Sequence, residues 1–291
     1  MPTNRPLWLI AAPVIFLCLW SGGYSVAKIG LLYSEPMTLL ALRYACVVVI
    51  MVILFAIIRP PLPKTRADWG HLAIVGVLIQ TVYFGMTYIA FLYGVAAGTV
   101  ALLMSLQPIL VAVIAPRWTG EAIGWKRWGG LALGLAGAAV VIIARSEVES
   151  PPAIGFVFAI LGLMGITIAT LWEKRFGLTH HPVTANLIGY TAGLLGILPF
   201  MFALETQQIS WTPGFMGALA YLVIGNSLIS VGLLLAMIRA GEVSKVSALF
   251  FLVPPLAAVI AWAMLGEVMP PLAWVGMAAA AAGVLIATRV R

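Results

Sequence analysis

The sequence predicts an all-α integral membrane protein: ten transmembrane helices in two inverted five-helix repeats, with both termini cytoplasmic. Three observations predict this fold class, namely the apolar composition, an internal repeat and the distribution of basic residues. The 291 residues are 63% hydrophobic and 9% charged, and their mean hydropathy is +1.11. A soluble domain carries about 25% charged residues. We therefore expect this chain to have the lipid bilayer as its main partner.

Apolar runs of roughly 17–25 residues are typical of membrane-spanning helices. The predicted spans are residues 7–33, 36–58, 69–93, 98–116, 127–144, 153–172, 183–203, 213–238, 246–265 and 270–288. These spans use most of the chain, so the connecting loops are short.

The two halves of the sequence repeat each other at a constant offset of 146 residues. Pro108 corresponds to Pro254, and the pair Gly120-Glu121 corresponds to Gly266-Glu267. We therefore expect one five-helix repeat in residues 1–146 and a second in residues 147–291. Because five is an odd number, the second repeat must enter the membrane with reversed polarity. Inverted repeats of this kind are typical of carriers whose substrate site lies near the membrane midplane. The alternative is a duplicated protein that transports nothing.

The net charge of +7 reflects topology. With the N-terminus in the cytoplasm, nearly all loop Lys and Arg residues fall on the cytoplasmic side, and Arg145 lies at the opposite surface. This asymmetry follows the positive-inside rule. We therefore expect no nucleic-acid partner. The expected partner besides lipid is a small-molecule substrate, and a monomer is compatible with this pattern.

Two glycine-rich spans suggest close helix packing. Gly130 and Gly134 lie four residues apart in span 127–144, and Gly276 and Ala280 do so in span 270–288. Small residues at this spacing let helices approach closely in lipid. We favour packing inside the bundle over a dimer contact. Prolines interrupt two other spans, and these candidate hinges are Pro108, Pro254 and Pro255.

Several stretches resemble the EamA repeat of the drug/metabolite transporter superfamily. They are Trp20-Ser-Gly-Gly-Tyr-Ser-Val-Ala-Lys28, Glu35-Pro-Met-Thr-Leu-Leu-Ala-Leu-Arg43 and the run from Leu106-Gln-Pro108 to Gly120-Glu121. As a whole, the chain looks most like YddG-type exporters of aromatic amino acids in bacterial inner membranes. This resemblance implies a ten-helix carrier with cytoplasmic termini.

The chain departs from the superfamily pattern in two ways. The second repeat has Gly189 at the position of Arg43. In addition, the first span and its counterpart lack the internal glutamate that small multidrug carriers use for proton exchange. We therefore expect export without a buried carboxylate relay.

Lys28 and Arg43 are the basic residues within predicted spans. Either residue could attract a substrate carboxylate, or both could extend their side chains to the outer interface. The candidate substrate-binding residues are polar or aromatic and lie on the inward faces of the spans. This set comprises Trp20, Tyr24, Gln80, Tyr83, Thr87, Gln107, Thr170, Asn226, Ser230, Ser247 and Phe250. For each of them, ordinary interhelical hydrogen bonding or packing is the simpler interpretation.

The sequence thus predicts an inner-membrane exporter of small organic metabolites, with aromatic or hydrophobic amino acids as the first candidates. Alternating access around a central cavity is the expected mechanism. A multidrug or nucleotide-sugar carrier of the same superfamily is the alternative, although phosphate groups would need several buried basic residues. An intramembrane enzyme is disfavoured, because no Cys/His or acid/His cluster occurs at membrane depth. We expect no catalytic residue, no metal site and no cofactor.

Overall fold

Helices dominate the parts of the chain that the structure, a computed structural model, describes: residues 7–114, 125–146, 152–176, 180–239, 249–250 and 252–289. The helices of the first half are α1 (Leu7–Gly30), α2 (Pro36–Ile58), α3 (Arg66–Gly76), η1 (Val77–Tyr83), α4 (Phe84–Leu92), α5 (Ala97–Met104), α6 (Gln107–Ile114) and α8 (Trp125–Ser146). Those of the second half are α9 (Ala153–Phe176), α10 (Pro182–Leu204), α11 (Pro213–Ala220), η2 (Tyr221–Ser230), α12 (Val231–Arg239), α14 (Val253–Leu265) and α15 (Pro271–Arg289). The segments η1 and η2 are π-helical.

Six helical stretches of the described chain are long and apolar enough to cross a membrane: Ala11–Gly30, Pro36–Ile58, Arg66–Leu92, Ala153–Glu173, Pro182–Leu204 and Pro213–Leu234. Shorter apolar helices cover Ala97–Val111, Trp128–Ala144, Val253–Leu265 and Pro271–Ile286. Each stretch overlaps one of the spans predicted from the sequence.

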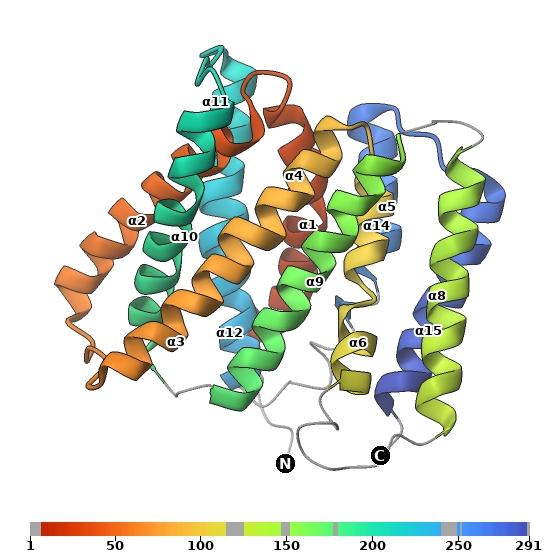
Figure 1. Cartoon of the computed structure of the whole chain (residues 1–291), viewed down its shortest axis with the longest axis horizontal. Coiled ribbons are helices and arrows are strands. Elements are labelled where there is room, and N and C mark those ends of the chain that lie inside the picture. The colour runs from red at the N-terminus through yellow and green to blue at the C-terminus, as the bar shows by residue number, and fades with distance from the viewer. Residues whose placement is uncertain are drawn as a thin grey trace.

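The internal repeat is visible in the helix boundaries. Helix α9 begins and ends 146 residues after α1, and α10 begins and ends 146 residues after α2. The π-helical segments also overlap at this offset, because residues 77–83 correspond to 223–229. In Figure 1, α1 and α9 run in opposite directions through the bundle, as expected of inverted repeats. The start of α1 and the end of α15 lie at the same end of the bundle.

Pro108 begins a new helix instead of kinking a continuous one. Helix α5 ends at Met104, and α6 begins at Gln107, so a two-residue turn replaces the single span predicted for residues 98–116. Pro254 is likewise the second residue of α14. At the first turn of a helix the missing N–H of proline has no intrahelical partner to lose. The prolines therefore favour the interruption.

Helices α8 and α15 lie side by side and join the two repeats through glycines (Figure 1). A Cβ on Gly137 would overlap the backbone of Gly276 and Ala280, and a Cβ on Gly283 would overlap Gly130 and Gly134. Since 137 and 283, and likewise 130 and 276, differ by 146, these contacts are reciprocal about a pseudo-two-fold axis. This confirms packing inside the bundle as the role of the glycine-rich helices.

We predict that Gly137→Ala destabilises the fold by about 1–3 kcal/mol, because the added methyl group has no space between α8 and α15. Thermal unfolding of the purified protein in detergent would measure this loss. Gly129→Ala in the same helix is the matched control, since Gly129 is exposed and a Cβ there meets no atom within 4 Å. Equal melting temperatures for the two variants would contradict the packing role of Gly137.

Candidate functional site

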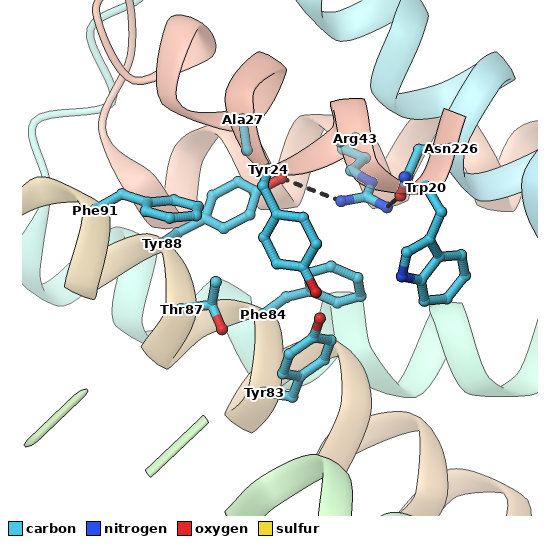
Figure 2. A pocket seen from close by; sticks show the side chains of 11 residues that line it. Trp20, Tyr24, Ala27, Arg43, Tyr83, Phe84, Thr87, Tyr88, Phe91 and Asn226 are labelled. Atoms are coloured by element: carbon cyan, nitrogen blue, oxygen red, sulfur yellow. Dashed lines mark hydrogen bonds between the residues drawn. The ribbon is translucent and has the colours of Figure 1, made fainter. Parts of the chain in front are cut away.

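A cavity of about 360 Å³ lies among α1, α2, α4, η1 and η2 (Figure 2). Its lining is aromatic, apart from one cation and a few neutral polar groups. The lining residues are Trp20, Gly23, Tyr24, Ala27, Arg43, Tyr83, Phe84, Thr87, Tyr88, Phe91 and Asn226. Of these, Asn226 comes from the second repeat, so the cavity lies where the two repeats meet.

Arg43 is the charged group of this cavity. Its side chain is buried, at 1% exposure, and its guanidinium donates three hydrogen bonds. Nε donates to Ser227 Oγ at 3.0 Å, Nη1 to the Tyr88 hydroxyl at 3.1 Å and Nη2 to Asn226 Oδ1 at 3.0 Å. The guanidinium also lies 4.7 Å above the centre of the Phe84 ring. All of these partners are neutral.

The motif Trp20-Ser-Gly-Gly lets η2 approach α1. A Cβ on Gly23 would overlap the Asn226 amide, and one on Gly22 would overlap the Tyr221 hydroxyl. Asn226 Nδ2 donates to Leu19 O at 3.3 Å while its Oδ1 accepts from Arg43. Asn226 therefore connects η2 to α1 and α2 at once. A π-helical turn is often found at functional sites, where it presents side chains that an α-helix would turn away.

The equivalent pair in η1 has a different role. Thr81 Oγ1 donates to Gly193 O at 3.1 Å, and a Cβ on Gly193 would overlap Gln80. Gln80 therefore packs against α10 and lines neither cavity described here, contrary to the prediction. The physical reason is Gly189, which replaces Arg43 in the second repeat and lies against Gly76 of α3. The helices approach so closely there that no cavity forms.

A second cavity, of about 800 Å³, adjoins the first. It is lined by Trp20, Tyr24, Tyr83, Ala101, Met104, Ser105, Gln107, Pro108, Ile166, Phe250, Val253 and Val284. Trp20, Tyr24 and Tyr83 line both cavities. The hydroxyls of the two tyrosines point toward each other (Figure 2). These three aromatic side chains therefore form a partition between the cavities.

The other candidate residues are distributed as follows. Thr87 lines the first cavity, and its buried Oγ1 has no hydrogen-bond partner among the described residues. Thr170 lines neither cavity, but its hydroxyl accepts a 2.7 Å hydrogen bond from Gln107 Nε2. Ser230 is fully buried and lines neither. Pro254 and Pro255 line a separate apolar pocket beside Trp274. Ser247 lies outside the described residues.

Sequence reasoning missed the aromatic residues Phe84, Tyr88 and Phe91. Phe84 and Tyr88 are four residues apart, as are Thr87 and Phe91, so helical spacing from Thr87 could have found them.

Lys28 forms an ion pair with Glu267, in which Nζ and Oε1 lie 2.6 Å apart. The Glu267 carboxylate is buried, at 6% exposure for the residue, and it also accepts hydrogen bonds of 3.2 and 3.0 Å from the Ala97 backbone N–H at the start of α5. An anion is favoured at that position by the helix dipole. Lys28 thus has its carboxylate within the protein, and it lines neither cavity. This contact replaces both roles proposed for Lys28 from the sequence.

The sequence profile of the EamA-like transporter family matches residues 6–143 and again residues 153–289. The chain belongs to the EamA-like transporter family. The two matches occupy the two halves of the chain, in agreement with the repeat. Together with the apolar helices, this membership makes the chain a multi-pass transporter of the bacterial inner membrane.

Relatives of this EamA-like transporter have names that refer to amino-acid export. A "Probable terminal-alkyne amino-acid exporter" of Streptantibioticus cattleyicolor is 26% identical over 99% of this chain and 95% of its own length. A "Probable amino-acid metabolite efflux pump" of Salmonella typhimurium is 24% identical over 94% of this chain and 92% of its own. A solved structure titled "Crystal structure of protein" shares the fold, with a TM-score of 0.64, 15% identity and 96% coverage of both chains.

We predict that the Lys28–Glu267 pair of this EamA-like transporter contributes a coupling energy of about 1–3 kcal/mol. Glu267→Gln leaves the Lys28 ammonium without its carboxylate, and Lys28→Met leaves a buried carboxylate without its cation. Each single variant should therefore melt below the wild type, whereas the double variant should recover part of the loss. Melting temperatures of the four proteins in detergent complete the cycle. Strictly additive losses would show that the pair has no coupling.

Proposed function

We propose that this protein exports aromatic and hydrophobic amino acids, and metabolites derived from them, by alternating access. The observation that carries the proposal is the pair of adjoining cavities at the contact between the repeats, separated by Trp20, Tyr24 and Tyr83. A mostly aromatic lining with a few oriented polar groups suits a compact solute that has an apolar body and one polar end. The names of the bacterial relatives agree with this class of substrate.

In this proposal all ten helical stretches cross the membrane, and both termini are cytoplasmic. Support comes from the basic loop residues and from the start of α1 and the end of α15 at one end of the bundle (Figure 1). The two repeats, residues 1–146 and 147–291, would be the moving bodies. The interruptions at Pro108 and Pro254 would be the hinges. Because one chain supplies both sides of the cavities, a monomer would suffice.

We further propose that export proceeds without a carboxylate proton relay. The residues that line the two cavities include no Asp, Glu or His. Glu267 is buried but paired with Lys28. A nucleotide-sugar carrier is the weaker candidate, because these linings contain Arg43 as their one basic residue, whereas a diphosphate needs several. A multidrug carrier differs by its preference for cations, which Arg43 would repel.

Counterflow in proteoliposomes would test transport through these cavities. Labelled phenylalanine and its N-acetyl derivative, competed by aromatic, aliphatic and cationic compounds, should exchange across the vesicle membrane. Ala101→Phe should abolish exchange, because Ala101 is buried in the wall of the second cavity and the larger ring would fill it. Ala132→Phe on the exposed face of α8 is the control for added bulk, and it should exchange as the wild type does.

Both variants must elute as folded protein on size exclusion for this comparison to count. Exchange by Ala101→Phe at the wild-type rate would contradict a path through the second cavity. If no compound exchanges in the wild type, the export function itself is wrong.

A further inference from the structure

The first cavity has a positive charge that its described lining does not neutralise. Arg43 is its ionisable group with a charge at neutral pH, and the other lining residues are aromatic, aliphatic or neutral polar. The second basic residue of the predicted spans, Lys28, has Glu267 as its partner. A buried cation without an anion is costly in a membrane protein, and such residues commonly mark the path of a substrate or ion.

The guanidinium of Arg43 retains two free donors in the described structure. An arginine carries five N–H groups. Those on Nε, Nη1 and Nη2 that are in use donate to Ser227, Tyr88 and Asn226. One N–H on each Nη therefore has no acceptor among the described residues. A carboxylate accepts two such donors in a bidentate pair, and it supplies the missing charge at the same time.

A charged amino group finds no comparable partner in this cavity. The lining contains no carboxylate, and Asn226 Oδ1 already accepts from Arg43. The face of Phe84 that could bind an ammonium group is occupied by the guanidinium, at 4.7 Å. The hydroxyl of Thr87, buried and without a described partner, is a neutral group that can accept or donate. Binding of a zwitterion would therefore leave the cavity with a net positive charge, whereas binding of an anion would leave it neutral.

We propose that the substrate binds as a monovalent anion: a carboxylate with an aromatic or apolar body and no charged amino group, such as an N-acylated or deaminated amino acid. The carboxylate pairs with Arg43, the body lies against Trp20, Tyr24 and Tyr88, and an amide or hydroxyl group of the substrate meets Thr87. This inference rests on the proposed export function for its biological meaning. The binding preference can nevertheless be measured without transport.

The test compares four compounds that share one phenyl body and differ in charge. They are N-acetylphenylalanine and 3-phenylpropionate, which are anions, phenylalanine, which is a zwitterion, and phenylalanine methyl ester, which is a cation at neutral pH. Binding to the purified protein is measured by ligand-dependent thermal shift and calorimetry. Both anions should bind roughly tenfold or more tightly than phenylalanine, since a charge-assisted hydrogen bond exceeds a neutral one by about this factor. The ester should bind most weakly.

Variants at the two buried cations separate the contribution of Arg43 from general charge effects. Arg43→Gln should remove the preference for anions, so that the four compounds bind within about twofold of one another. The double variant Lys28→Met/Glu267→Gln removes one positive and one negative charge outside the cavity, and it should keep the wild-type order of preference.

The outcomes distinguish this inference from the export function. Phenylalanine or its ester binding as tightly as the anions would overturn the inference, and counterflow of phenylalanine would still support export. Tight binding of the anions without counterflow would support the inference and contradict export. If Arg43→Gln does not fold, the order of the four compounds on the wild type decides alone. Retention of the preference by folded Arg43→Gln would overturn the role of Arg43.

Discussion

The contact between Arg43 of α2 and η2 is the interaction on which the rest of the structure depends. It places a cation at 1% exposure inside a bundle that lipid surrounds, and it satisfies three N–H groups with side chains of the opposite repeat. Burial of a charge is unfavourable unless its environment is polar and ordered. The π-helical turn of η2 provides this order, because it presents Asn226 and Ser227 together. The same contact holds two repeats against each other around a cavity.

The pseudo-two-fold symmetry explains the scaffold, and its one clear violation explains the site. Helices α8 and α15 make reciprocal glycine contacts, and α1 and α9 have corresponding boundaries. At the Arg43 position the second repeat has Gly189, which allows α3 and α10 to pack backbone against backbone. A large charged side chain keeps its neighbours apart, whereas a glycine draws them together. One of two equivalent positions therefore becomes a cavity, and the other becomes a packing contact.

Much of this fold could be predicted from the sequence, because helix positions depend on local hydrophobicity and the repeat on a constant offset. The helix ranges, the glycine packing and most of the cavity-lining residues on α1 and α4 follow from such patterns. The orientation of Gln80 toward Gly193 could not be predicted, since it depends on how closely α10 approaches η1. The burial of Glu267 was also missed. Its position after a helix suggests a solvent-exposed residue, and only tertiary packing brings it to Lys28 and Ala97.

One face of α1 connects the cavities to the Glu267 contact. Trp20, Tyr24 and Lys28 are four residues apart, so they lie along the same side of the helix over about 12 Å. Trp20 and Tyr24 form the partition with Tyr83, and Lys28 binds the carboxylate that also receives the first N–H of α5. Any shift of α1 that opens the partition must therefore move Lys28 relative to α5 and α14. A substrate that displaces Tyr24 would thereby strain an ion pair two helical turns away, and this mechanical link is what alternating access requires.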